Sequence, residues 1–92
     1  MTNSNIDKAS AIIVLLLAKR AADATLCPSE AARALAAENR SMEWRTAMPV
    51  VHAAVDGLLD NGDVLLSWKG EPLKARSGPY RIALSNEVSR ER

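Results

Sequence analysis

The apolar residues of three segments recur at the spacing of an α-helix, and those of two later segments alternate as in a β-strand. The first helix is expected to span about Ile6 to Ala21. Ser4, which has Asp7 at capping-box spacing, and Asn5 are equally good N-caps. At about 100° per residue, five apolar side chains share one face. This predicted buried stripe consists of Ile6, Ala9, Ile13, Leu16 and Leu17.

Leu15 lies nearly opposite the centre of that stripe. One interpretation is a short apolar helix that is covered on more than one side, or that simply exposes two residues off the stripe, Val14 and Leu15. The other is a homodimer contact through Leu15, with Ile12 at its rim, because large apolar patches usually have a partner. The pattern leaves both interpretations open.

A second helix is predicted to begin at Pro28, because the first helical position needs no N–H and therefore suits a proline. Cys27 is then the N-cap and Glu30 occupies position N3. Glu30 and Arg33 have the spacing of an exposed surface pair. Just before the helix, Thr25-Leu26 is a candidate for a very short strand.

The third helix is predicted at residues 47–61. Pro49 determines this placement, because a proline deep inside a helix costs about 3 kcal/mol. With Thr46 as the N-cap, Pro49 falls at N3, where no intrahelical bond is lost. Asn61 and Gly62 supply the C-terminal stop. The buried stripe consists of Val51, Ala54, Val55, Leu58 and Leu59.

Two alternating runs, Val64–Trp68 and Tyr80–Leu84, flank a loop at 69–79 that is rich in turn formers and basic side chains. This arrangement predicts an antiparallel hairpin. We call residues 64–84 the wing. The order of elements predicts a mostly α fold with a small β-hairpin, namely a winged helix-turn-helix of three helices plus a wing.

Composition agrees with one folded unit. The chain has 92 residues, of which 48% are apolar and 25% charged, as in a single globular domain. We expect one winged-helix domain over residues 1–92, with an ordered core at about 6–84. The polar, unpatterned segment at 86–92 is predicted to be a flexible tail.

The sequence predicts neither a membrane segment nor a signal peptide. Its longest uncharged apolar run, Ala11 to Ala18, is far shorter than the roughly 18 residues that cross a bilayer. The start, MTNSNID, lacks a basic region ahead of a hydrophobic stretch. A single cysteine forbids an internal disulfide and fits a reducing compartment. We therefore expect a cytoplasmic protein.

The net charge of +1 argues against binding nucleic acid by bulk electrostatics, but its distribution is uneven. Residues 1–39 are neutral, with four basic and four acidic side chains. Residues 40–61 sum to −1, from two basic and three acidic side chains. Residues 62–81 sum to +2, from four basic and two acidic side chains, so the positive surplus lies in the wing.

Several sequence motifs together indicate a particular protein family within this fold. They are LCPSEAARAL, WRTAMPVVHAAVDGLLDNGDV, WKG and GPYRIAL. Over about residues 6 to 84, these motifs resemble a small bacterial family, the domain-of-unknown-function family 3253. The resemblance implies a winged-helix-like fold, and the family has no established activity to carry over. The chain departs from the pattern at His52, where similar chains carry a basic residue, and this departure weakens the case for a DNA-reading third helix.

The predicted fold makes double-stranded DNA the first candidate partner and transcriptional regulation the first candidate role. The third helix of a helix-turn-helix enters the major groove by its N-terminal residues. Asp56 and Asp60 would face phosphates poorly, so docking should use the helix tip and the wing. The alternative is a protein–protein interaction module without DNA binding, which the near-neutral charge favours. The predicted DNA contacts are Arg45, Thr46, His52, Lys69, Lys74 and Arg76.

The sequence predicts no enzyme, metal site or cofactor. Cys27 at a helix N-terminus could have a lowered thiol pKa, although the simpler interpretation is a small, partly buried residue. One Cys and one His cannot supply the four ligands of a structural zinc site. No pair of titratable groups is spaced to divide acid and base roles.

The two tryptophans could stack on nucleic-acid bases, but packing is the simpler prediction. The chain has no Phe, so its core needs the few large rings that it has. We expect Trp44 to fill the gap between the second and third helices, and Trp68 to cover the base of the hairpin.

Overall fold

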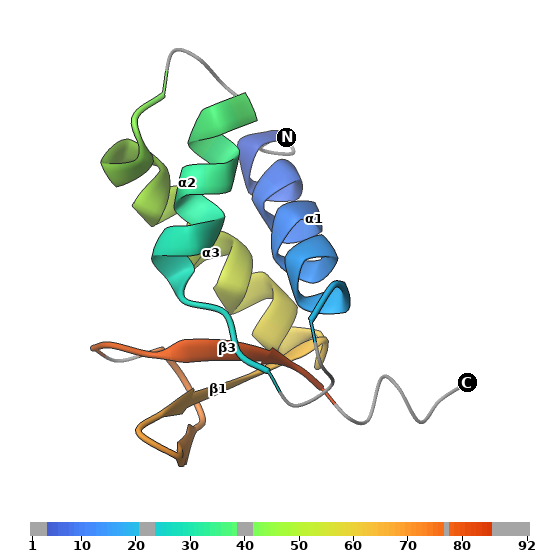
Figure 1. The fold of residues 1–92 in the computed structure, drawn as a ribbon. Helices are drawn as coiled ribbons and strands as arrows, with labels where there is room; N and C mark the ends of the chain where they lie inside the picture. Colours follow the sequence, from blue (N-terminus) through green and yellow to red (C-terminus); the bar gives the residue numbers. More distant parts are fainter. Residues whose placement is uncertain (1–3, 21–23, 39–41, 77, 86–92) are drawn as a thin grey trace.

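The computed structural model describes residues 4–20, 24–38, 42–76 and 78–85. Figure 1 shows three helices gathered on one side of a small antiparallel sheet, which is the layout of a winged helix. The predicted tail at 86–92 lies outside the described residues. The elements are α1 (Ser4–Ala18), α2 (Pro28–Glu38), α3 (Trp44–Asp60), β1 (Val64–Trp68), β2 (Glu71–Leu73) and β3 (Arg81–Leu84).

One apolar core joins the helices to the sheet, because each helix turns its apolar stripe toward its neighbours. Ile12 belongs to this core and is only 8% exposed. The sequence places Ile12 at the rim of an exposed patch, and this placement needs correction: α1 packs against both α2 and α3, so its buried face is wider than the predicted stripe. The largest fully buried side chains are Ile13, Leu26, Leu35, Ile82, Val51, Val55 and Val64.

α1 begins two residues before the predicted start and ends at Ala18. Ala21, the predicted end, lies outside the described residues. After Ala18 the chain turns so that Arg20 can donate to the Thr25 carbonyl, at 2.9 Å, and pair with Glu30 of α2. These contacts tie the residues just after α1 to the start of α2.

The predicted start of α2 is confirmed at Pro28. The Cys27 N–H donates to the Glu30 carboxylate at 3.1 Å, and the Glu30 N–H donates back to the Cys27 carbonyl at 2.9 Å. Glu30 therefore satisfies an N–H group that the helix start leaves without an intrahelical partner. Just before Cys27, Leu26 exchanges two backbone hydrogen bonds with Ile82, so the short strand predicted there exists as a single bridge.

The predicted start of α3 is wrong. The helix begins at Trp44 with Glu43 as an extended N-cap, and the Ala47 N–H donates to the Glu43 carbonyl at 3.0 Å. Pro49 consequently lies inside the helix, where it cannot donate to the Arg45 carbonyl. Both residues are on the exposed side, where water can reach that carbonyl. The early start places the Trp44 ring against the core.

The C-terminal stop of α3 is confirmed. Gly62 adopts a left-handed φ of 81°, and its N–H donates to the Leu59 carbonyl at 3.0 Å. The Asp63 N–H donates to the Leu58 carbonyl at 2.9 Å, which completes a Schellman motif. The motif turns the chain directly into β1.

The wing contains a strand that the sequence does not predict. β2 pairs with β1 across a two-residue turn, in which Lys69 and Gly70 have φ values of 52° and 84°. Two positive φ angles match the twist of a tight hairpin. Pro72 has no N–H, but β2 is an edge strand and tolerates it, in the order β2-β1-β3. The predicted pairing of β1 with the last strand is confirmed, from Val64–Leu84 to Ser67–Arg81.

Candidate nucleic-acid interface

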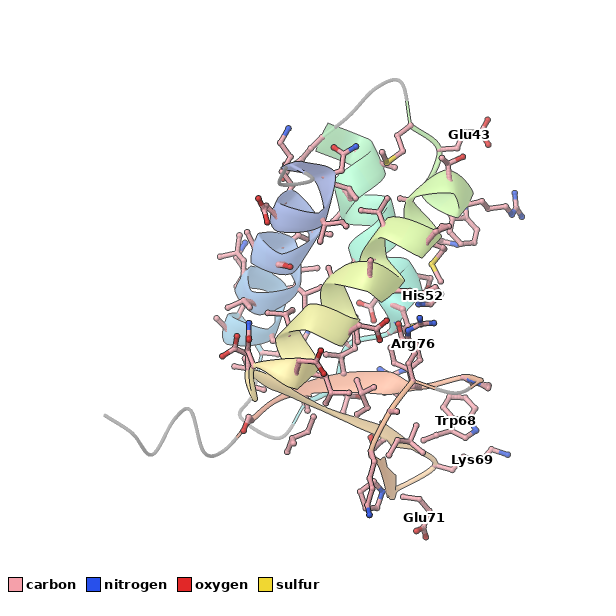
Figure 2. All side chains as sticks on the ribbon, turned by 180° about the vertical axis from the view of Figure 1, so that it is seen from behind. Glu43, His52, Trp68, Lys69, Glu71 and Arg76 are labelled. Carbon is pink, nitrogen blue, oxygen red and sulfur yellow. The ribbon has the colours of Figure 1, made fainter. Side chains whose placement is uncertain are left out.

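The predicted DNA contacts come from two elements that face the same side of the molecule. Figure 2 shows Glu43, His52, Arg76 and Lys69 following one another along the edge opposite α1. α3 supplies the upper part of this edge and the wing supplies its lower part. The helix and the hairpin are therefore placed to contact one extended partner together. The exposed members of the predicted set are Arg45, Thr46, Lys69, Lys74 and Arg76.

At the N-terminal end of α3, the half-buried Trp44 lies beside two guanidinium groups. The Arg45 guanidinium carbon is 4.9 Å from the ring centroid, and that of Arg33 from α2 is 4.7 Å away. Both distances are those of cation–π contacts. The prediction that Trp44 packs between α2 and α3 agrees with this position.

Arg33 is the residue that sequence reasoning misses at this end. The predicted Glu30–Arg33 pair does not form, because Glu30 instead binds Arg20 and caps α2. The exposed position of Arg33 on α2 is readable from the helix pattern. Its proximity to Trp44 is not, because that contact depends on how α2 crosses α3.

Midway along α3, His52 is tied to the wing. Its Nδ1 lies 2.6 Å from the Tyr80 hydroxyl, and the two rings are 5.6 Å apart. Burial raises the pKa of Tyr80 to about 12. Burial also lowers the pKa of His52, with the Arg76 charge acting in the same direction and Asp56 opposing it. A protonated Tyr80 hydroxyl and a neutral His52 ring therefore share this hydrogen bond across the boundary between α3 and the wing.

One turn further along, Asp56 binds Arg76 of the wing. Nε and Nη2 of Arg76 each lie 3.0 Å from one oxygen of the carboxylate, in a bidentate geometry. The hydrogen bond from Arg76 is the main cause that lowers the pKa of Asp56. The Arg76 side chain is 35% exposed and the Asp56 side chain is 48% exposed, so the pair lies at the surface. Arg76 thus holds the wing against α3 and is not an unpaired cation.

Lys69, in the turn at the tip of the wing, and Lys74, directly after β2, are exposed, and the described residues offer neither of them a hydrogen bond or an ion pair. Trp68, at the end of β1, is 38% exposed rather than buried. The core that covers Leu66 ends before it reaches Trp68, since the last pair of the β1–β2 ladder lies beyond the helices. The prediction of a core role for Trp68 is therefore wrong.

A second polar cluster surrounds the start of α2. Cys27 Sγ lies 3.1 Å from the Ser29 hydroxyl, and this hydrogen bond is the main cause that lowers the pKa of the thiol. The charge of Arg81 acts in the same direction. Arg81 itself donates to the Thr25 hydroxyl at 2.6 Å. Cys27 thus has a basic neighbour, Arg81 of β3, which the sequence does not reveal. The Arg81 side chain is already hydrogen-bonded to Thr25.

The described part of the chain offers no group of three His, Cys, Asp or Glu side chains that could hold a metal ion. Within the same residues, no helix combines the length and the apolar character that a membrane crossing requires.

Two comparisons with known proteins bear on identity. The search of curated proteins found no match for this chain. A family model described as "Protein of unknown function (DUF3253)" matches residues 7–85, which include all three helices in nearly their full length and the whole wing. The match covers most of the 92 residues and agrees with the motifs of the second helix, the third helix and the hairpin. The chain therefore belongs to this family.

Proposed function

We propose that this protein binds double-stranded DNA, in a regulatory role, through the N-terminal end of α3 and the tip of the wing. The observation that carries the proposal is the set of exposed basic side chains along one edge. Arg45 is in the first turn of α3, just after Glu43 at one end of that edge, Lys69 lies at the other end, and Lys74 directly follows β2. Helix-turn-helix proteins present the same end of the third helix to the major groove.

The charge distribution supports docking by these two points. Asp56 and Asp60 follow on the C-terminal half of α3, and Asp60 is exposed. Their negative charges would repel phosphates if the helix lay along the groove over its full length. Contact through the helix tip and the wing tip keeps both carboxylates away from the DNA backbone. Phosphate contacts of this kind supply affinity and orientation but carry no sequence information.

His52 and Arg76 have a different place in the proposal. Each side chain bonds across the boundary between α3 and the wing, to Tyr80 and Asp56 respectively. These bonds fix the angle between the two contact points. We propose that both residues act first as positioning residues, and that Arg76 reaches a phosphate only if it leaves Asp56.

Fluorescence anisotropy of a labelled mixed-sequence duplex tests DNA binding. The logarithm of affinity should fall with the logarithm of salt at a slope of about −0.9 per phosphate contacted. The double variant Lys69→Ala, Lys74→Ala should flatten that slope by about 2. The matched control Lys8→Ala, Lys19→Ala removes the same charge from α1 and the turn after it, and should leave the slope unchanged. Lack of binding at about 50 mM salt would contradict the proposal.

An exposed apolar site on α1 supports a second proposal, namely a protein–protein contact, either in a homodimer or with another protein. Leu15 is 55% exposed, and its neighbour Val14 is exposed as well. We propose that Leu15 forms the contact without Ile12, which the core buries. Leu15→Glu should then reduce the mass measured by light scattering to that of one chain. Leu65→Glu, at an equally exposed leucine of β1, is the control. A monomeric wild-type protein would contradict the dimer, and a protein partner without duplex binding would favour the interaction module.

A further inference from the structure

Two positive charges from separate helices meet at one indole ring. Arg33 of α2 and Arg45 of α3 both lie within 5 Å of the centre of Trp44. We call these three residues the Trp44 cluster. Both arginines are exposed, whereas Trp44 is half-buried and packs against the core. The ring is therefore anchored in the core and carries two exposed side chains.

Among the residues that the structure describes, neither arginine of the Trp44 cluster has an acidic partner. The ion pairs among the described residues engage Arg20 and Arg76. Glu30, one turn before Arg33, already binds Arg20 and the Cys27 N–H. Glu43 precedes Trp44, but it is exposed and its side chain makes no capping bond. Two like charges thus lie at one ring, and an anion beside that ring would be attracted by both of them.

We propose that the Trp44 cluster binds the DNA backbone, with Arg33 as an additional phosphate contact supplied by α2. The inference rests on the proposed function, and it adds an element that the sequence does not implicate. A guanidinium group stacked on an aromatic face keeps its N–H groups in its own plane, directed away from the ring, where they can donate to phosphate oxygens. Its planar donor set also suits two oxygens of one phosphate.

Binding at the Trp44 cluster would hold DNA at the N-terminal end of α3, opposite the end where Asp60 lies. Arg33 would contact the backbone from α2, while Thr46 remains available at the helix tip. Because phosphates are the same in every sequence, the cluster should position the duplex without selecting a site. Its loss should therefore weaken all duplexes alike.

Arg33→Met and Arg45→Met test the cluster separately, because methionine retains an apolar contact with the ring but removes the charge. Each variant should flatten the salt dependence of duplex affinity by about 1 in slope between roughly 50 and 200 mM salt. Lys8→Met is the matched control, since it removes one exposed charge from α1, across the molecule. It should leave the slope unchanged. Circular dichroism at the working temperature establishes that each variant is folded.

The outcomes separate the inference from the function on which it rests. If wild-type protein binds with a steep salt dependence and Arg33→Met behaves like Lys8→Met, the Trp44 cluster is not a phosphate site, although DNA binding stands. If no protein binds the duplex at low salt, the proposed function fails and the inference fails with it. A flatter slope in Arg33→Met and Arg45→Met, but not in Lys8→Met, supports both.

Discussion

The two ends of α3 hold their arginines in opposite ways. At the N-terminal end, Arg45 and its neighbour Arg33 share the Trp44 ring, and the described part of the chain gives them no acidic partner. In the C-terminal half, Arg76 comes in from the wing and is bound by both oxygens of Asp56. One end therefore presents unpaired charge to an anion, and the other uses an equivalent charge to fasten the wing.

This difference shows that the position of a basic residue does not by itself tell whether its charge is available. The wing carries the positive surplus of the sequence, yet Arg76 is bound to Asp56 and Arg81 is bound to Thr25. Lys69 and Lys74 remain as its unpaired cations among the described residues. At the N-terminal end of α3, which lies in a segment of negative net charge, Arg45 is a further unpaired cation among these residues, and Arg33 of α2 lies beside the same ring.

The largest effect should come from removing the platform at the N-terminal end. Trp44→Ala should lower the free energy of unfolding by about 2 kcal/mol, less than the loss for a fully buried tryptophan, because Trp44 is half-buried. Trp68→Ala, at the exposed end of β1, should lower it by about 1 kcal/mol or less. Urea denaturation measures both values. Equal losses would show that Trp44 is not packed more closely than Trp68.

Asp56→Asn should leave the C-terminal half of α3 with an unpaired arginine, as at its N-terminal end. It releases Arg76, so duplex affinity at low salt should rise by up to about tenfold, with a salt slope steeper by about 1. Asp60→Asn makes the same charge change without releasing an arginine, and should give a smaller gain. In an Arg76→Met background, Asp56→Asn should lose most of its effect. An unchanged gain there would mean that Asp56 acts only by repelling phosphates.

Much of this arrangement is encoded locally and part of it is not. Pro28 with Glu30, and Gly62 after α3, are short-range signals, and the structure confirms the boundaries that they predict. The start of α3 depends instead on Trp44 reaching the core, which overrides the local preference of Pro49. β2 is hidden because Pro72 argues against a strand unless its position at the sheet edge is known.

In the candidate interface, too, some features follow from the local sequence and others depend on how the elements pack. The sequence predicts Arg45 and Thr46 as exposed residues at the entry to the third helix, and the structure finds both exposed in its first turn. The pairing of Asp56 with Arg76 joins residues 20 positions apart, and it depends on the path by which the wing returns to α3. No spacing rule links such residues. The same applies to Arg33 and Trp44, which meet only when α2 and α3 pack.

The stability of the boundary between α3 and the wing should depend on pH through His52. Burial, assisted by Arg76, lowers the pKa of His52, so the unfolded chain binds a proton more readily than the folded chain. Stability should therefore be fully present above pH ~6.5, the pKa of an unperturbed histidine, and fall as the pH drops below it. Denaturation curves at several pH values measure this. His52→Gln should remove the dependence in this window, and a dependence that persists would contradict the assignment.

The smallest expected effect is on stability at the Asp56–Arg76 pair. Both side chains are substantially exposed, so water screens their attraction. A double-mutant cycle with Asp56→Asn and Arg76→Met should give a coupling energy of about 0.2–1 kcal/mol in thermal or urea unfolding. A value well above this range would mean that the pair is a major support of the fold rather than a surface tie.

The most direct test of the account is to map the duplex onto the protein by NMR. Amide shifts of ¹⁵N-labelled protein, followed during titration with a short duplex at low salt, report which backbone segments sense the DNA. The account predicts the largest changes around Arg33, at 44–46 and at 69–74, with small changes at Asp60 and along α1. Changes centred on Leu15, or none at saturating duplex, would contradict the claim that the unpaired cations of α2, α3 and the wing form a DNA-binding edge.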